Sequence, residues 1–151
     1  MDTTTLLDRL ELTDLVSRLG VCLDEARFDE MHDLFTPDAS ARTPGGEAIG
    51  RDRVVAQAAR NHRAEDGIQH VITNLLVDVD GDHATMRANL VVHVAHPTGA
   101  PSLAPHLTFS LGEVYRFEAR RTADGWRLTR VETVPVWLAG DLQPAPQPAA
   151  R

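Results

Sequence analysis

Two residue types are absent or almost absent from this chain. It has no lysine, so every cationic side chain is an arginine, which we attribute to the base composition of the source genome. Its one cysteine is Cys22. A single cysteine excludes an intramolecular disulfide and a cysteine-based metal cluster.

Long apolar runs and basic clusters are also missing. No run approaches the ~18 apolar residues that a membrane span needs, so we expect no membrane partner. The N-terminus lacks the basic and apolar regions of a signal peptide, which favours a cytoplasmic location. The net charge is −7 and there is no large basic block, so we expect no nucleic-acid partner.

The overall composition is that of a globular domain, with 42% hydrophobic and 25% charged residues. A length of 151 residues fits one domain with a single sizeable core. We expect residues 1–142 to form this domain. Residues 143–151 are rich in proline, alanine and glutamine, and are predicted to be a disordered tail.

The first part of the chain has the 3.6-residue periodicity of helices. The spacing predicts a helix over residues 6–24, a short one over 28–35 that the Thr36-Pro37-Asp38 segment ends, and a third over 52–63. Gly20 falls inside the apolar stripe of the first helix, where a glycine lets another element come close. Asp24 ends the same helix on the flank of its apolar face, a position equally suited to a surface or capping residue.

The pattern then changes to the period of two that strands have. Strands are predicted over residues 69–79, 84–96, 107–120 and 126–138, with a shorter one over 39–43 and a loop over 97–105. Helices followed by antiparallel strands indicate the α+β class. Strands of this length should curl into a cone-shaped barrel that the three N-terminal helices close, leaving an interior pocket.

The strand that begins near residue 69 carries unusual polar residues. Alternation places His70, Ile72, Asn74 and Leu76 on one face. A histidine and an amide among apolar side chains are expected in a cavity that binds a ligand and transfers protons. The alternative is that His70 is a hydrogen-bonded histidine at the start of a strand.

A second polar residue falls on an apolar strand face. Leu111, Glu113, Tyr115 and Phe117 form the more apolar face of their strand, so Glu113 should point inward. A buried carboxylate needs a partner or takes up a proton. Glu113 is therefore either an acid with a raised pKa or a structural residue in a salt bridge.

The remaining histidines give no metal pattern. His93 and His96 are three residues apart in a strand and face opposite sides, so only one of them can enter the pocket. His62 and His83 are predicted to be solvated. No spacing demands a metal ion, and neither a glycine-rich phosphate loop nor a Gly-x-Ser-x-Gly motif is present, so we expect no cofactor. General acid–base chemistry is favoured over covalent or redox chemistry.

Several stretches, in this order and spacing, resemble the signature of SnoaL-like proteins, members of the nuclear transport factor 2-like superfamily. They are DEARFDEMHDLFTPD at residues 24–38, HVITN at 70–74, DGWRL at 124–128 and WLAG at 137–140. The resemblance spans residues 6–140 and implies a cone-shaped α+β barrel. Within the superfamily the chain looks most like scytalone dehydratase and the bile-acid dehydratases.

The resemblance implies roles for individual residues. In the dehydratases an aspartate at the end of the first helix supports a histidine at the start of this strand, and Asp24 and His70 match those positions. It places His93 near a second family histidine, and Glu113 and Tyr115 among polar groups that face the cavity. The family tyrosines stand at Leu23 and Gly20 here, which puts dehydration of the family substrate in doubt. Tyr115, the only tyrosine, is the candidate replacement.

The function expected from these residues is a cofactor-independent dehydratase, cyclase or isomerase. Its substrate would be a small apolar oxygenated molecule, such as a polyketide, terpenoid or steroid-like compound. The expected pocket lining is Phe28, Asn74, Leu111 and Trp137. The alternatives are a non-catalytic ligand-binding or oligomerisation module of the same fold and an epoxide hydrolase-like activity. Apolar residues on an exposed sheet face predict a homo-oligomer, either a dimer or a trimer.

Overall fold

The computed structural model describes residues 2–97 and 105–141. Its elements are, in order, α1 (Thr3–Asp24), α2 (Phe28–His32), β1 (Phe35–Thr43), β2 (Gly46–Ile49), α3 (Arg51–Asn61), β3 (Gly67–Asp80), β4 (His83–Ala95), β5 (Phe109–Thr122) and β6 (Gly125–Gly140). The tail predicted at residues 143–151 and most of the loop predicted at residues 97–105 lie outside the described residues.

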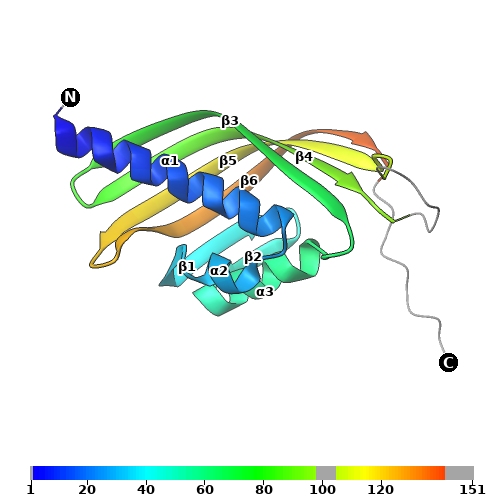
Figure 1. Cartoon of the computed structure of the whole chain (residues 1–151), viewed down its shortest axis with the longest axis horizontal. Coiled ribbons are helices and arrows are strands. Elements are labelled where there is room, and N and C mark those ends of the chain that lie inside the picture. The colour runs from blue at the N-terminus through cyan, green and yellow to red at the C-terminus, as the bar shows by residue number, and fades with distance from the viewer. Residues whose placement is uncertain (1, 98–104, 142–151) are drawn as a thin grey trace.

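The six strands form one sheet in the order β2-β1-β6-β5-β4-β3. Neighbouring strands are antiparallel except for β1 and β6, which are parallel. The sheet curls, and the three helices lie on one side of it (Figure 1). The predicted α+β class and curled, mostly antiparallel sheet are confirmed. The sheet is not a closed barrel, because β2 and β3 remain its two free edges.

Helix α1 forms because its sequence combines a capping residue with a long apolar stripe. The Asp2 side chain accepts a hydrogen bond from the Thr5 N–H at 2.8 Å, which satisfies one of the free donors of the first turn. The stripe packs mainly against β3. The buried residues of α1 are Asp8, Leu12, Leu15, Val16, Leu19, Gly20, Cys22 and Leu23.

The second predicted helix is too long. Helix α2 ends at His32, and β1 already begins at Phe35, so the segment 36–38 that was expected to end the helix is part of a strand. Pro37 explains the difference, because it lacks an N–H and holds Thr36 in an extended conformation. The pairing of β1 with β6 is interrupted where the proline falls, between Phe35 and Ser40. The short strand β2 was not predicted.

A polar cluster ties α1 to the far end of the sheet. The buried carboxylate of Asp8 accepts two hydrogen bonds from the Arg121 guanidinium, at 2.7 and 2.8 Å, and one from Trp126 Nε1 at 3.0 Å. The guanidinium carbon also lies 4.6 Å from the centre of the Trp126 ring. The carboxylate is therefore fully paired, as a buried charge must be.

Strand β3 changes the face that it buries at Asn74. This residue has a φ of +54°, and the register with β4 shifts between Thr73 and Leu76. His70 and Ile72 lie on the helix side before the shift, and Leu75, Val77 and Val79 are the buried or half-buried positions after it. The predicted alternation is wrong beyond Thr73, because the irregularity inserts one residue into the strand.

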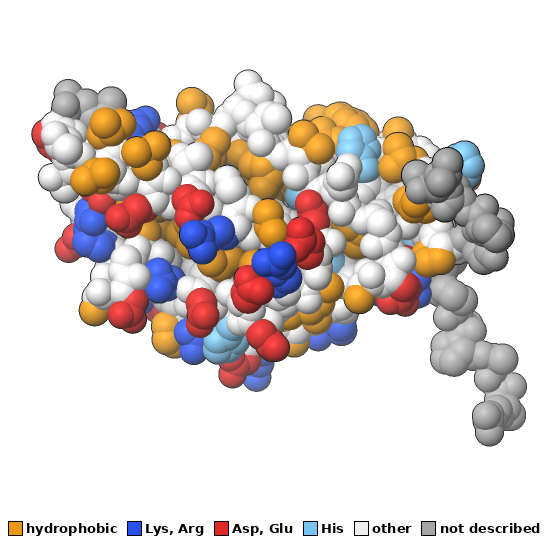
Figure 2. Space-filling view, viewed as in Figure 1, with side chains coloured by type: hydrophobic (Ala, Val, Ile, Leu, Met, Phe, Trp, Pro, Cys, Tyr) orange, Lys and Arg blue, Asp and Glu red, His pale blue; other side chains and the backbone are white. Residues whose placement is uncertain are grey.

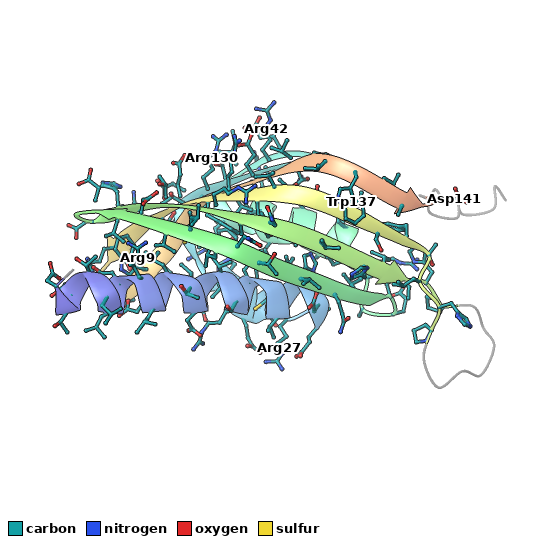
Figure 3. The ribbon with its side chains drawn as sticks, turned by 90° about the horizontal axis from the view of Figure 1, so that it is seen from above. Arg9, Arg27, Arg42, Arg130, Trp137 and Asp141 are labelled. Atoms are coloured by element: carbon teal, nitrogen blue, oxygen red, sulfur yellow. The ribbon has the colours of Figure 1, made fainter. Side chains whose placement is uncertain are left out.

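The outer face of the sheet is mixed in character. Arg42 and Arg130 point away from α1, and Trp137 lies near the end of β6 (Figure 3). A Cβ added at Gly112 would overlap the Trp137 indole, so the glycine lets this ring lie flat against β5. Exposed apolar side chains also occur on the side that carries α1, where they are interspersed with charged ones (Figure 2). Within the described residues, no helix is both long and apolar enough to cross a membrane.

Candidate active site

The end of α1 and the start of β3 bring Asp24 and His70 together, as predicted. His70 Nδ1 lies 2.6 Å from Asp24 Oδ1, and the backbone N–H of His70 donates to the same oxygen at 2.8 Å. The His70 side chain is 3% exposed and that of Asp24 25% exposed. A carboxylate bonded to Nδ1 leaves Nε2 as the nitrogen of His70 that can exchange a proton with another group.

Gly20 makes this approach possible. A Cβ at this position would lie 3.3 Å from Ile72 Cδ1 and 4.0 Å from His70 Cβ, so the missing side chain leaves room for β3. The predicted close approach of another element at Gly20 is therefore confirmed. The Asp24–His70 site therefore lies beside Gly20, one turn before Asp24, where α1 has no side chain.

His62, predicted to be solvated, is a member of this site. It follows the last residue of α3, and its Nε2 lies 3.3 Å from His70 Nε2. The two ring centroids are 5.1 Å apart. His62 Nδ1 lies 2.8 Å from the Ala58 carbonyl oxygen. The signal in the sequence was the position of His62 on the apolar face of the third helix, beside Val54 and Ala58.

Burial lowers the pKa of His62, because its charged form loses water contacts. The Ala58 carbonyl raises the pKa by accepting from the ring, the charge on His70 lowers it and Asp24 raises it. Desolvation is the largest of these effects. His62 is therefore held in its neutral form over a wider pH range than a solvated histidine.

Glu113 and Tyr115 point inward from β5, as predicted. Both are buried, at 8% and 4% exposure. Burial raises the pKa of the Glu113 carboxyl above its ordinary value, against a hydrogen bond with Thr133 and the attraction of His70. Burial also raises the pKa of the Tyr115 hydroxyl, with the negative charges of Glu113 and Asp24 adding to the effect. Tyr115 thus keeps its hydroxyl hydrogen at neutral pH and can donate a hydrogen bond, and burial shifts the equilibrium of Glu113 toward its protonated form.

A small interior cavity lies between the helices and the sheet. Its volume is about 60 Å³, room for roughly four ordered waters. Polar groups of His62, Tyr115, Gln57 and Asn61 meet an apolar wall there. The lining residues are Leu19, Leu23, Met31, Phe35, Ala41, Thr43, Val54, Gln57, Ala58, Asn61, His62, Tyr115 and Val131.

Three predicted residues lie away from this interior. Asn74 is exposed, because the irregularity in β3 turns it outward. His93 is on the outer face of β4, where its Nδ1 lies 2.7 Å from the Ser110 hydroxyl, so the strand register excludes it from the Asp24–His70 side. Trp137 is 46% exposed and covers Gly112 on the outer face.

The other predicted lining residues have intermediate positions. Phe28 packs against the edge of the core, while Met31 and Phe35 reach the cavity. Leu111 lies on the inner face between its strand partners Val92 and Leu138. His96 bonds to Asp66 at 2.9 Å.

The pattern of ligating side chains gives no metal centre. In residues 2–97 and 105–141, no three histidine, cysteine or carboxylate side chains are grouped as ligands of one ion. The chemistry that the described residues offer is transfer of protons among imidazole, carboxyl and phenol groups.

Comparisons with known proteins agree with this fold. The SnoaL-like domain family matches residues 4–132 of the chain. An uncharacterised protein of Mycobacterium tuberculosis is 34% identical over 130 residues, covering 83% of this chain and 84% of its own.

Two solved structures have the same fold at lower identity. A protein of Novosphingobium aromaticivorans, provisionally named a scytalone dehydratase, is 20% identical with a TM-score of 0.80, covering 100% of this chain and 99% of its own. A nuclear transport factor 2-like superfamily protein of Salmonella enterica is 14% identical with a TM-score of 0.75, covering 87% and 92%. The resemblance predicted from the sequence motifs is confirmed.

Proposed function

Because the chain belongs to the SnoaL-like domain family, we propose that it is a cofactor-independent enzyme that moves a proton at a carbon next to a carbonyl group. The reaction class is dehydration, cyclisation or isomerisation. The observation that carries the proposal is the partly buried Asp24–His70 pair, with Nδ1 and Oδ1 2.6 Å apart. A base of this kind, fixed in an apolar interior, suits abstraction of a weakly acidic proton.

Asp24 fixes the tautomer and the orientation of His70. Its oxygen accepts from Nδ1, which directs the lone pair of neutral His70 to Nε2. The negative charge also stabilises the imidazolium that forms when Nε2 takes a proton. The backbone hydrogen bond from His70 to the same oxygen keeps the carboxylate in place while the ring changes charge.

Glu113 and Tyr115 are the groups proposed to bind the carbonyl oxygen. The Tyr115 hydroxyl keeps its hydrogen at neutral pH and can donate it in a hydrogen bond, and Glu113 can donate in its protonated form, toward which burial shifts it. Donors held in an apolar site stabilise the negative charge that develops on an enolate oxygen. Tyr115 takes the place that the absence of tyrosine at positions 20 and 23 leaves open.

The substrate proposed is small and largely apolar. Leucine, valine, methionine, phenylalanine and alanine side chains form most of the cavity wall. At about 60 Å³ the cavity is far below the roughly 300–1,000 Å³ of occupied ligand pockets. A polyketide, terpenoid or steroid-like molecule therefore requires the lining side chains to move on binding.

A ligand-binding module of the same fold is the second candidate. It is favoured by the small volume of the cavity. It is also favoured because both nitrogens of His62 and of His70 already have partners. If the protein is only a binding module, it should still bind its ligand, without converting it, after His70 is removed.

The test is His70→Ala, assayed with a panel of β-hydroxy ketones and cyclic enones. We expect turnover by the wild type and a loss of about 10²–10⁴-fold in kcat for the variant, the usual contribution of a general acid or base. His83→Ala, at the exposed first residue of β4, is the matched control. Full turnover by a folded His70→Ala protein would refute the proposed catalytic role.

A further inference from the structure

The hydrogen-bond partners of His62 and His70 determine where each ring carries its proton. The partner of His62 Nδ1 is the Ala58 carbonyl oxygen, which can only accept, so this nitrogen must bear a hydrogen. The partner of His70 Nδ1 is the Asp24 carboxylate, which also accepts. The hydrogen of each neutral ring is therefore already assigned to Nδ1.

This assignment leaves two lone pairs facing each other. In neutral rings with Nδ1–H, both Nε2 atoms are acceptors, and they lie 3.3 Å apart. Two acceptors at this distance repel each other, while one added proton turns the contact into an N–H···N hydrogen bond. The contact is thus favourable only when the pair holds one proton more than two neutral rings.

We infer that His62 and His70 share one proton between their Nε2 atoms, which makes His62 the second acid–base residue of the site. The acid–base role of His62 rests on the proposed function. The sharing of the proton rests on the hydrogen-bond geometry alone.

The charges around the pair are consistent with a single added proton. Asp24, on α1, neutralises it directly across the bond to His70. From β5, Glu113 interacts electrostatically with His70, and Tyr115 is uncharged at neutral pH. A second proton would place two positive rings 5.1 Å apart.

A pair with one proton can act as acid and base in the same reaction. In a dehydration, one imidazole removes the proton on the carbon next to the carbonyl, and the imidazolium gives its proton to the leaving hydroxyl. The C–H and C–O bonds break, the C=C bond forms, and water departs. The pair ends with one proton, as it began, so no external acid or base is consumed. Both events occur on one face of the substrate, because the two nitrogens are adjacent.

The test is long-range ¹H–¹⁵N NMR of the histidine rings in the whole protein at neutral pH, without substrate. We expect both Nδ1 atoms to be protonated and both Nε2 resonances to lie between the protonated and unprotonated ranges. In His62→Gln the amide donates to His70 Nε2 but takes up no proton, so that Nε2 should move to the unprotonated range. His83→Gln, at the exposed first residue of β4, should leave the His70 resonances unchanged.

Activity provides the second measurement. We expect His62→Gln to lower kcat by about 10²-fold, as the loss of one acid–base group does. The shared proton would be refuted if both Nε2 atoms of the wild type were unprotonated. It would also be refuted if the His70 Nε2 resonance were the same in His62→Gln as in the wild type. Should His62→Gln fail to fold, the wild-type spectrum alone decides. If the spectra show a shared proton but the protein converts no carbonyl compound, the proposed function would be refuted and the inference of a shared proton would stand.

Discussion

A single oxygen of Asp24 accepts two hydrogen bonds from His70, one from its ring and one from its backbone. The ring bond sets the tautomer, and the backbone bond anchors the end of α1 to the start of β3. Asp24 therefore has a structural and a chemical role at the same time. An isosteric substitution can separate the two, since it keeps an accepting oxygen and removes the charge.

Asp24→Asn is that substitution. The amide oxygen can still accept from the His70 backbone, so we expect the fold and the thermal unfolding midpoint to be close to wild type. The imidazolium form of His70 would then have no anion beside it to stabilise it. The kcat should fall about 10²-fold or more. An NMR titration of His70 together with the assay checks both effects, and an unchanged titration would mean that the charge of Asp24 does not act on the ring.

Glu113→Gln should make stability less sensitive to pH. Burial raises the folded-state pKa of Glu113 above its ordinary value of 4.5, so the folded state binds this proton more tightly than the unfolded chain does. The free energy of unfolding is then lowered as the pH rises above 4.5 and through the raised pKa. The variant has no carboxyl to ionise. We expect it to be more stable than the wild type at neutral pH and similar to it in acid.

The measurement is denaturant unfolding of both proteins at neutral and acidic pH. Glu118→Gln is the matched control, because Glu118 belongs to the same strand and is exposed. Equal stability of Glu113→Gln and the wild type at every pH would mean that burial of Glu113 has no energetic cost.

Asp8→Ala should destabilise the protein without changing its chemistry. The substitution leaves Arg121 and Trp126 without their buried acceptor, at a cost of about 1–3 kcal/mol in the free energy of unfolding. The hydrogen bonds from Arg121, then that from Trp126, lower the pKa of Asp8 below 3.8. Its contribution to stability is therefore present above that pH and lost as the pH falls through the lowered pKa.

Urea unfolding at neutral and low pH measures this difference. The wild type and the variant should converge in acid. Asp82→Ala is the control, because Asp82 also bonds to Arg121, at 3.0 Å, but is exposed. A variant as stable as the wild type at neutral pH would show that the Asp8 cluster contributes nothing.

Periodicity predicted the fold class and the inward faces of His70 and Glu113, and the family resemblance predicted the pairing of Asp24 with His70. Periodicity was wrong at Asn74, where one extra residue in β3 reverses the alternation. His93 was placed by resemblance to a family position, while the register of β4 turns it outward. His62 was missed because its partner is eight residues away across a turn, a contact that no periodic pattern encodes.

The parallel pairing of β1 with β6 was also beyond the sequence pattern. It joins residues about ninety positions apart and depends on the path of the whole chain, as with Phe35 and Leu128. The extent of β1 was misjudged for a local reason, since Pro37 was read as the end of a helix and instead sits within a strand.

The extra residue at Asn74 divides β3 into two stretches that can vary independently. The first, up to Thr73, presents its even-numbered residues to the histidine site, and the second presents its odd-numbered residues to the core near the β3–β4 turn. A shift of register in either stretch would have to pass through a residue with φ of +54°. Substitutions of core residues in the second stretch therefore need not disturb His70 in the first.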